Sequence, residues 1–432
     1  MADHSPGAAQ PTRVGMRGSI EPWFSAYALA GLLVNGIVPL LIPLTVTARG
    51  PVAVATVLAA FFAGQLLAPV IGSVADRTGT QRIIFLGSFP LMGAAAIGFG
   101  LATDVLGWSV AAVVAGTTAG AVQTLGSVFI VEGHPKSEWD ERIGWFRFVF
   151  GVGQVSGLAI GAVFAGGHVH LGWFVAGGVI LLGAWLGRLG LPHLSRQQSD
   201  APDRSPTTAP ATAPAVAPNA APNAAPTDPP AAATGSLQKE LRGPFGRFLL
   251  SWLLAMTAVQ TFLNVMPLVM RDAFHVSASH TATWYLVASV AGACLYPVCG
   301  ALARRHGCGW VLGTGLTITL LGLLLMTGGW LWHQPGATWL GIAGLILVAL
   351  GYPFDYIGAT MMAADLTTDG EGSAMGLFNS AVAAGAIIGA TAPSALAAKF
   401  GYGALPPLAA GLIVVAILVG ARVFLQHIRK PS

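Results

Sequence analysis

The sequence predicts an all-α membrane protein in which twelve transmembrane helices form two related six-helix bundles. Three observations lead to this fold class. Hydrophobic residues make up 54% of the chain and charged residues only 9%, long apolar stretches follow one another, and landmarks of the first half return in the second. A water-soluble domain carries about 25% charged residues, so a surface this poor in charge must largely face lipid.

The apolar stretches have the length that a bilayer requires, because a hydrocarbon core about 30 Å thick is crossed by roughly 20 residues of helix. The first stretch is too long for a signal peptide and lacks a clear cleavage site, so we expect it to remain as a helix. The predicted helices cover residues 23–47, 52–74, 82–102, 105–132, 142–166, 171–191, 246–270, 280–303, 309–332, 337–362, 373–398 and 403–426.

The segments outside these stretches divide the chain into four parts. A polar tail (1–21) precedes an N-terminal six-helix bundle (22–192), and a C-terminal bundle (243–432) follows a linker (193–242). The linker is rich in Ala and Pro, and Pro every few residues prevents a helix and leaves nothing to build a core. We expect a disordered, passive tether, with a docking role as the alternative.

Lys and Arg are distributed unequally between the two predicted faces. One face holds Arg49, Arg271 and Lys399, whereas nearly all the others fall on the face of the N-terminus. By the positive-inside rule, both termini and the linker lie in the cytoplasm, and the protein is a multi-pass protein of the plasma (inner) membrane. The net charge of +4 is modest and no aromatic-basic stripe is present, so nucleic acid is not an expected partner.

The two halves repeat one another. Residues 72–79 (GSVADRTG) and 300–307 (GALARRHG) share Gly, Ala, Arg and Gly at the same spacing, 228 positions apart. The same offset relates Pro39 to Pro267, and an offset of 232 relates Gly153 to Gly385. Duplicated six-helix units are a known transporter architecture.

The first of these loops has features of a charged latch. A Gly allows close helix contact or a tight turn, and an acid at a helix end can accept hydrogen bonds from nearby basic residues. Such a latch could hold one access state and release another, or the residues could simply fix the topology. The predicted latch comprises Gly72, Asp76, Arg77, Gly79 and Arg82, joined by Glu132 and Arg142. We expect Glu132 to contact Arg77, Arg82 or Arg142.

Residues 72–82 resemble the loop signature of the major facilitator superfamily, with both Gly, the Asp, the first Arg and one basic residue of the final pair in place. The resemblance covers nearly the whole chain and implies the twelve-helix fold of secondary transporters, with a central cavity lined by helices 1, 4, 7 and 10. Two marks of the drug:proton antiporter branch are missing, an Arg in the fourth helix and a Gly-Pro pair in the fifth. Their absence argues against drug antiport in particular.

Two ionisable residues lie inside predicted helices, where a charge costs a few kcal/mol and therefore indicates function. Asp355 is the candidate for proton coupling, with a static ion pair or a hydrated position as the alternative. Arg147 could bind an anionic substrate or pair with an acid such as Glu132. Both are expected in the cytoplasmic half of the membrane.

Polar and aromatic residues at mid-depth form the predicted substrate cavity, where amides and phenols can hydrogen-bond a solute while rings pack on its apolar face. Each of them could instead hold two helices together. Besides Arg147, the cavity candidates are Asn35, Gln123, Gln154, Gln260, Asn264, Tyr352, Tyr356 and Asn379.

These features predict a secondary transporter that moves a small organic solute by alternating access, with proton coupling and a lean towards export. The alternatives are uptake of a sugar or another metabolite, and a membrane receptor or structural protein that does not transport. Nothing indicates an enzyme, a cofactor or a metal, because the chain lacks a phosphate-binding loop and its three cysteines show no ligand spacing. We expect a monomer.

Overall fold

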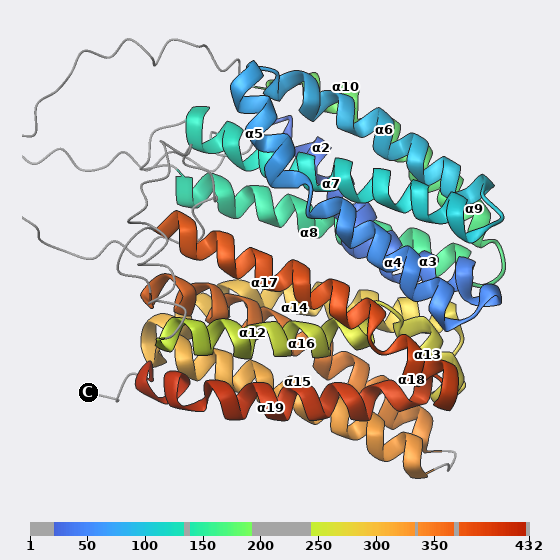
Figure 1. The fold of residues 1–432 in the computed structure, drawn as a ribbon, viewed down its shortest axis with the longest axis vertical. Coiled ribbons are helices and arrows are strands. Elements are labelled where there is room, and N and C mark those ends of the chain that lie inside the picture. Colours follow the sequence, from blue (N-terminus) through green and yellow to red (C-terminus); the bar gives the residue numbers. More distant parts are fainter. Residues whose placement is uncertain (1–20, 134–138, 192–242, 333–335, 367–370, 429–432) are drawn as a thin grey trace, which may run out of the picture.

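The computed structural model describes residues 21–133, 139–191, 243–332, 336–366 and 371–428. The described residues form a two-bundle arrangement, with the first half in blue to green and the second in yellow to red (Figure 1). Twelve helices within them are long and apolar enough to cross a membrane. The predicted fold class is therefore confirmed, whereas the predicted linker and all of the predicted tail except Glu21 lie outside the described residues.

The helices of the first half follow the expected stretches closely. They are α2 (Phe24–Gly31), the π-helical turn η1 (Leu32–Ile37), α3 (Val38–Val46), the short η2 (Thr47–Arg49), α4 (Pro51–Gln65), α5 (Ala68–Thr78), α6 (Gln81–Leu101), α7 (Val105–Gly133), α8 (Trp139–Phe164), α9 (Val169–Leu181) and α10 (Gly183–Arg188). The segments α2 to η2 make one spanning helix, α4 and α5 a second, and α9 with α10 another.

The second half repeats this organisation. Its helices are α12 (Pro244–Leu263), α13 (Met266–Phe274), α14 (Ala278–His306), α15 (Cys308–Trp332), α16 (Ala337–Asp365), α17 (Glu371–Thr391), α18 (Ser394–Phe400), the short η4 (Tyr402–Ala404) and α19 (Leu405–Gln426). We call the end at which α12 begins and α19 ends the linker side, on the left in Figure 1.

Several spanning helices contain breaks that the apolar pattern did not indicate. Helix α4 ends at Gln65, and α5 begins with a Pro in its first turn. Helix α12 ends at Leu263, and α13 likewise begins with Pro267 in its first turn. Pro393 likewise precedes α18. Pro has no N–H to donate, so it suits a first helical turn and interrupts a helix elsewhere.

The internal repeat is visible in how the helices pack. A Cβ placed on Gly153 of α8 would lie 1.7 Å from the carbonyl oxygen of Ala28 on α2. A Cβ on Gly385 of α17 would lie 2.8 Å from the Cβ of Met256 on α12. Met256 stands 228 positions after Ala28, and Gly385 stands 232 after Gly153. The same small residues therefore bring equivalent helix pairs together in both halves.

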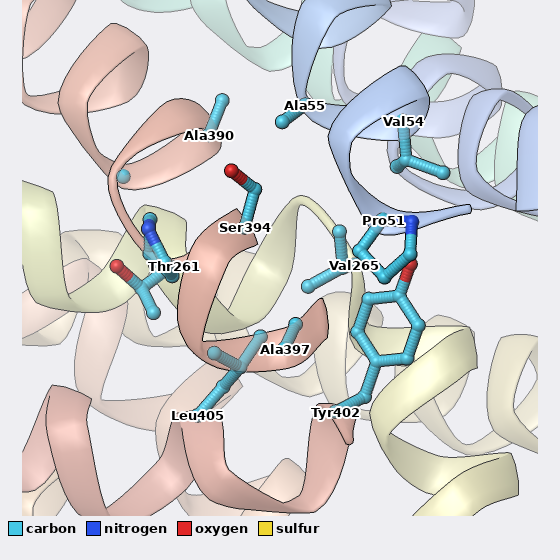
Figure 2. A pocket seen from close by; sticks show the side chains of 12 residues that line it. Pro51, Val54, Ala55, Thr261, Val265, Ala390, Ser394, Ala397, Tyr402 and Leu405 are labelled. Carbon is cyan, nitrogen blue, oxygen red and sulfur yellow. The ribbon is translucent and has the colours of Figure 1, made fainter. Parts of the chain in front are cut away.

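The halves also meet at the side opposite the linker side. There α13 packs against α3 and α18 against α4, and the Ser279 hydroxyl donates to the Ala162 carbonyl at 2.8 Å. A small pocket lies in this seam (Figure 2), with Val54 and Ala55 from α4 facing Ala390 and Ser394 from α17 and α18. None of the predicted site residues lines this pocket.

Candidate functional site

Side chains from both halves converge on Arg147 of α8. Its Nη1 atom lies 3.4 Å from the hydroxyl of Tyr27 on α2. Three tyrosines of the second half also lie within electrostatic range of the guanidinium, Tyr296 on α14 and Tyr352 and Tyr356 on α16. We call these five residues the Arg147 cluster, and it joins two predicted tyrosines to the predicted arginine.

The cluster is polar and reachable from outside the packed bundles. Arg147 is exposed, whereas Tyr296, Tyr352 and Tyr356 are half-buried and Tyr27 is buried. The arginine is therefore accessible although tyrosines of both halves lie within its electrostatic range. Helix α8 begins at Trp139, earlier than predicted, so Arg147 lies eight positions, roughly 12 Å, from that end.

Stacked rings hold the cluster on each side. The Tyr27 ring lies parallel to that of Phe146, with centroids 3.5 Å apart. In the second half, Tyr352 and Tyr356 have ring centroids 6.0 Å apart, and Tyr356 contacts Phe378 edge to face. Such contacts fix the rings and thereby the direction of their hydroxyls.

Tyr27 and Tyr296 were not among the predicted site residues. The chain has only six tyrosines, and four of them belong to this cluster. Because tyrosine is rare in this chain, its positions could have pointed to the site from the sequence alone. Only the fold could show that these four tyrosines lie near one another.

Asn35 and Gln154 were predicted separately and lie together. The Asn35 amide donates to the Gln154 side-chain oxygen at 3.3 Å, linking η1 to α8. Asn35 lies in the π-helical turn, and such turns are frequent at functional sites. Both amides are half-buried.

The other predicted amides do not join this pair. Gln123 donates at 3.4 Å to the backbone of its own helix. Gln260 is half-buried on α12, and Asn264, one turn further at the end of that helix, is 4% exposed. The Asn264 Nδ2 atom has no hydrogen-bond partner among the described residues. Asn379 is exposed on α17.

Asp355 is buried next to the Arg147 cluster, within electrostatic range of Tyr352 but not hydrogen-bonded to any member of the cluster among the described residues. It has no exposed surface, and its Oδ2 atom accepts a hydrogen bond of 2.9 Å from Thr319 on α15. Its other carboxyl oxygen has no partner among the described residues and faces Gly315, where an added Cβ would lie 2.4 Å away. No described cation pairs with it. The carboxyl therefore sits between α15 and α16, and its role in proton coupling stays a prediction.

The latch residues are only partly described. Gly72 is buried in α5, and Gly79 ends that helix with φ +67°, a conformation that Gly adopts without strain. Arg77 is exposed, and Arg82 donates to the Leu191 carbonyl at 3.1 Å. The side chains of Asp76 and Glu132 lie outside the described part, so the expected contacts of Glu132 stay a prediction.

Arg142 has a partner that the sequence did not suggest. Its Nη1 atom lies 2.5 Å from Oε1 of Glu21, and the other carboxyl oxygen, Oε2, accepts from the Trp23 indole N–H at 2.5 Å. The pair connects the start of α8 to Glu21, three residues before the first spanning helix. No group of three or more potential metal ligands occurs among the described residues.

The sequence profile of the Major Facilitator Superfamily matches residues 23–251 and again 248–432. The chain belongs to the major facilitator superfamily. It is thus a multi-pass membrane protein of a superfamily of transporters, and the predicted resemblance is confirmed. The two successive matches also agree with the internal repeat.

Solved structures of this superfamily share the fold. The chain is similar to a point mutant of the nucleoside transporter NupG (TM-score 0.70, 11% identity), over 95% of this chain and 99% of that one. It is also similar to a bacterial homologue of the human lysosomal transporter Spinster in an inward-facing, occupied conformation. The TM-score is 0.68 and the sequence identity 14%, over 95% of this chain and 98% of that one. For a D-xylose–proton symporter the TM-score is 0.68 and the sequence identity 13%, over 95% of this chain and 97% of that one. No curated protein matches the chain significantly.

Proposed function

We propose that this protein is a secondary transporter that carries a small organic solute across the plasma membrane by alternating access. The observation that supports this most is the Arg147 cluster, because its side chains come from both halves of the repeat. A solute bound there touches both bundles, so rocking of one bundle against the other changes the side from which the solute is reached.

The chemistry of the site indicates the size and polarity of the solute. Tyrosine hydroxyls both donate and accept hydrogen bonds, and their rings pack on apolar faces. The Asn35–Gln154 pair adds amide groups from η1 and from α8, the helix that also carries Arg147. Nucleoside and xylose carriers among the structural relatives act on compact polar ring compounds, which supports a solute of similar size here.

Proton coupling through Asp355 is part of the proposal. The carboxyl group is fully buried and has one hydrogen bond and one unpartnered oxygen. Burial of such a group costs much less free energy when the group is protonated and neutral. Loading and unloading that proton would alter the contact between α15 and α16. Because α16 also carries Tyr352 and Tyr356, such a change would reach the solute site.

Export is the proposed direction, with both termini in the cytoplasm. The length of the chain and the loop at residues 72–82 support it by analogy with efflux members of the superfamily. Uptake of a sugar or another metabolite is the competing direction. A proton gradient imposed in either sense on proteoliposomes separates the two, because only one sense drives accumulation of an exported solute.

Counterflow in proteoliposomes tests the transport function itself. Vesicles with the purified chain are preloaded with one unlabelled compound at a time, from nucleosides, pentoses, hexoses and aromatic acids, and the labelled compound is added outside. We expect accumulation of at least one compound, and loss of several-fold in rate for Tyr356→Phe, since one hydrogen bond contributes about 1 kcal/mol. Tyr402→Phe, in the seam, is the matched control. If none of the tested compounds accumulates in the vesicles, the proposed transport function is contradicted.

A further inference from the structure

The Arg147 guanidinium carries a charge that nothing in the described structure neutralises. Its one hydrogen bond to a described side chain, 3.4 Å to the Tyr27 hydroxyl, is long. A guanidinium has five N–H donors, so most of its capacity is open. The other four members of the cluster are phenols, which are neutral at physiological pH.

The described acidic side chains are all engaged elsewhere. Glu21 pairs with Arg142, Asp104 accepts from the Gly107 amide, Asp272 from the Tyr402 amide, Asp355 from Thr319 and Asp365 from the Cys308 thiol. None lies within ion-pair distance of Arg147 among the residues that the structure describes. The cluster therefore has a net charge of +1.

An uncompensated cation between two apolar bundles is costly, and a bound anion removes that cost. The planar guanidinium suits a carboxylate or phosphate, since it can form two parallel hydrogen bonds to either group. The tyrosines around it offer further donors to the same oxygens and ring faces for the remainder of the molecule. Four neutral phenols could not supply the missing negative charge.

We infer that the transported solute is a small organic anion, whose carboxylate or phosphate binds Arg147 and whose body packs against Tyr296, Tyr352 and Tyr356. This inference rests on the proposed transport function and adds the charge of the solute to it. The accessible surface of Arg147 and its position between the halves are what allow a solute to reach it.

Matched pairs of probes that differ in charge test the inference. Counterflow of nicotinate against nicotinamide, glucuronate against glucose, and uridine monophosphate against uridine is measured with the purified full-length chain. In at least one pair, we expect the anion to exchange ten-fold faster or more than its neutral partner. Arg147→Gln should abolish this preference, and Arg147→Lys should retain part of it, because Lys keeps the charge but loses the paired hydrogen bonds.

Two controls keep the outcome interpretable. Monodispersity and thermal unfolding of each variant show whether it folds. Glu132→Gln tests whether Arg147 is instead held by that acid, in which case this substitution and Arg147→Gln would impair all probes alike and overturn the inference. If the neutral member of each pair exchanges faster, and Arg147→Gln does not change this preference, the inference of an anionic solute is overturned while the proposed transport function is not. If no compound exchanges, both the anion inference and the proposed transport function are contradicted.

Discussion

At the residue scale, Asp355 is distinguished by its isolation. It is a completely buried carboxyl in a membrane helix, with a single hydrogen bond from Thr319 and no described cation beside it. Tyr352 and Tyr356 on the same helix lie within electrostatic range of Arg147, whereas the Asp355 carboxyl contacts Thr319 on α15. One helical turn of α16 thus contacts two different environments.

Replacing Asp355 by Asn should separate coupling from exchange. The amide keeps the shape but cannot take up or release a proton, so we expect proton-driven accumulation to fall at least ten-fold while counterflow persists. The measurement is solute uptake with and without an imposed pH gradient in proteoliposomes. Thr319→Val, which removes only the hydrogen bond, is the companion variant. Intact proton-driven accumulation in Asp355→Asn would show that this carboxyl is not the coupling site.

Gly315 should tolerate no side chain. Its Cβ would lie 2.4 Å from the Asp355 carboxyl and 2.6 Å from the Asp355 backbone nitrogen. Gly315→Ala must therefore push α15 from α16, at a cost of about 1–3 kcal/mol. Gly313→Ala, two residues earlier with open space around it, is the control. Thermal unfolding in detergent should show a lowered midpoint for the first variant alone, and equal midpoints would contradict the described packing.

At the element scale, the close pairs α2–α8 and α12–α17 are the repeated unit of the fold. Glycines on α8 and α17 let the backbone of one helix touch that of the other, at positions that correspond between the halves. In a membrane, where lipid is as apolar as Leu, such backbone contact is a main source of helix association. The contact also sets where Arg147 and Phe146 face the first spanning helix.

Gly153→Ala should therefore weaken the first half. The added methyl group would lie 1.7 Å from the Ala28 carbonyl oxygen, on backbone that cannot turn aside. We expect a loss of about 1–3 kcal/mol in stability, seen as a lower unfolding temperature. Gly151→Ala, with nothing near its Cβ, should leave the temperature unchanged. A similar drop for both variants would indicate a helix-propensity effect instead of packing.

At the scale of the whole molecule, the seam opposite the linker side should open during transport. Ala55 and Ala390 line the same pocket from opposite halves (Figure 2). In a chain without the native cysteines, Ala55→Cys with Ala390→Cys should cross-link and stop counterflow, and a reductant should restore it. Each single variant serves as control. Full transport after complete cross-linking would exclude an opening seam.

The linker leads to a second prediction at this scale. Removal of residues 201–236 should leave transport within about two-fold of the full chain, since Ala/Pro-rich sequence of this kind acts as a spacer. Counterflow rates normalised to reconstituted protein give the comparison. A large loss would favour the docking role over the passive tether.

The sequence by itself determined the twelve spanning helices, the duplication and the superfamily, because hydrophobic length and residue spacing are local properties of a chain. It also selected Arg147, Asp355 and two of the tyrosines, since charge and phenols inside apolar stretches are visible without a fold. It could not show that Tyr27 and Tyr296 join Arg147, that Glu21 pairs with Arg142, or that Asp355 faces Thr319. Those relations depend on the rotation of each helix about its axis. Packing between distant segments sets that rotation, so only the tertiary structure decided them.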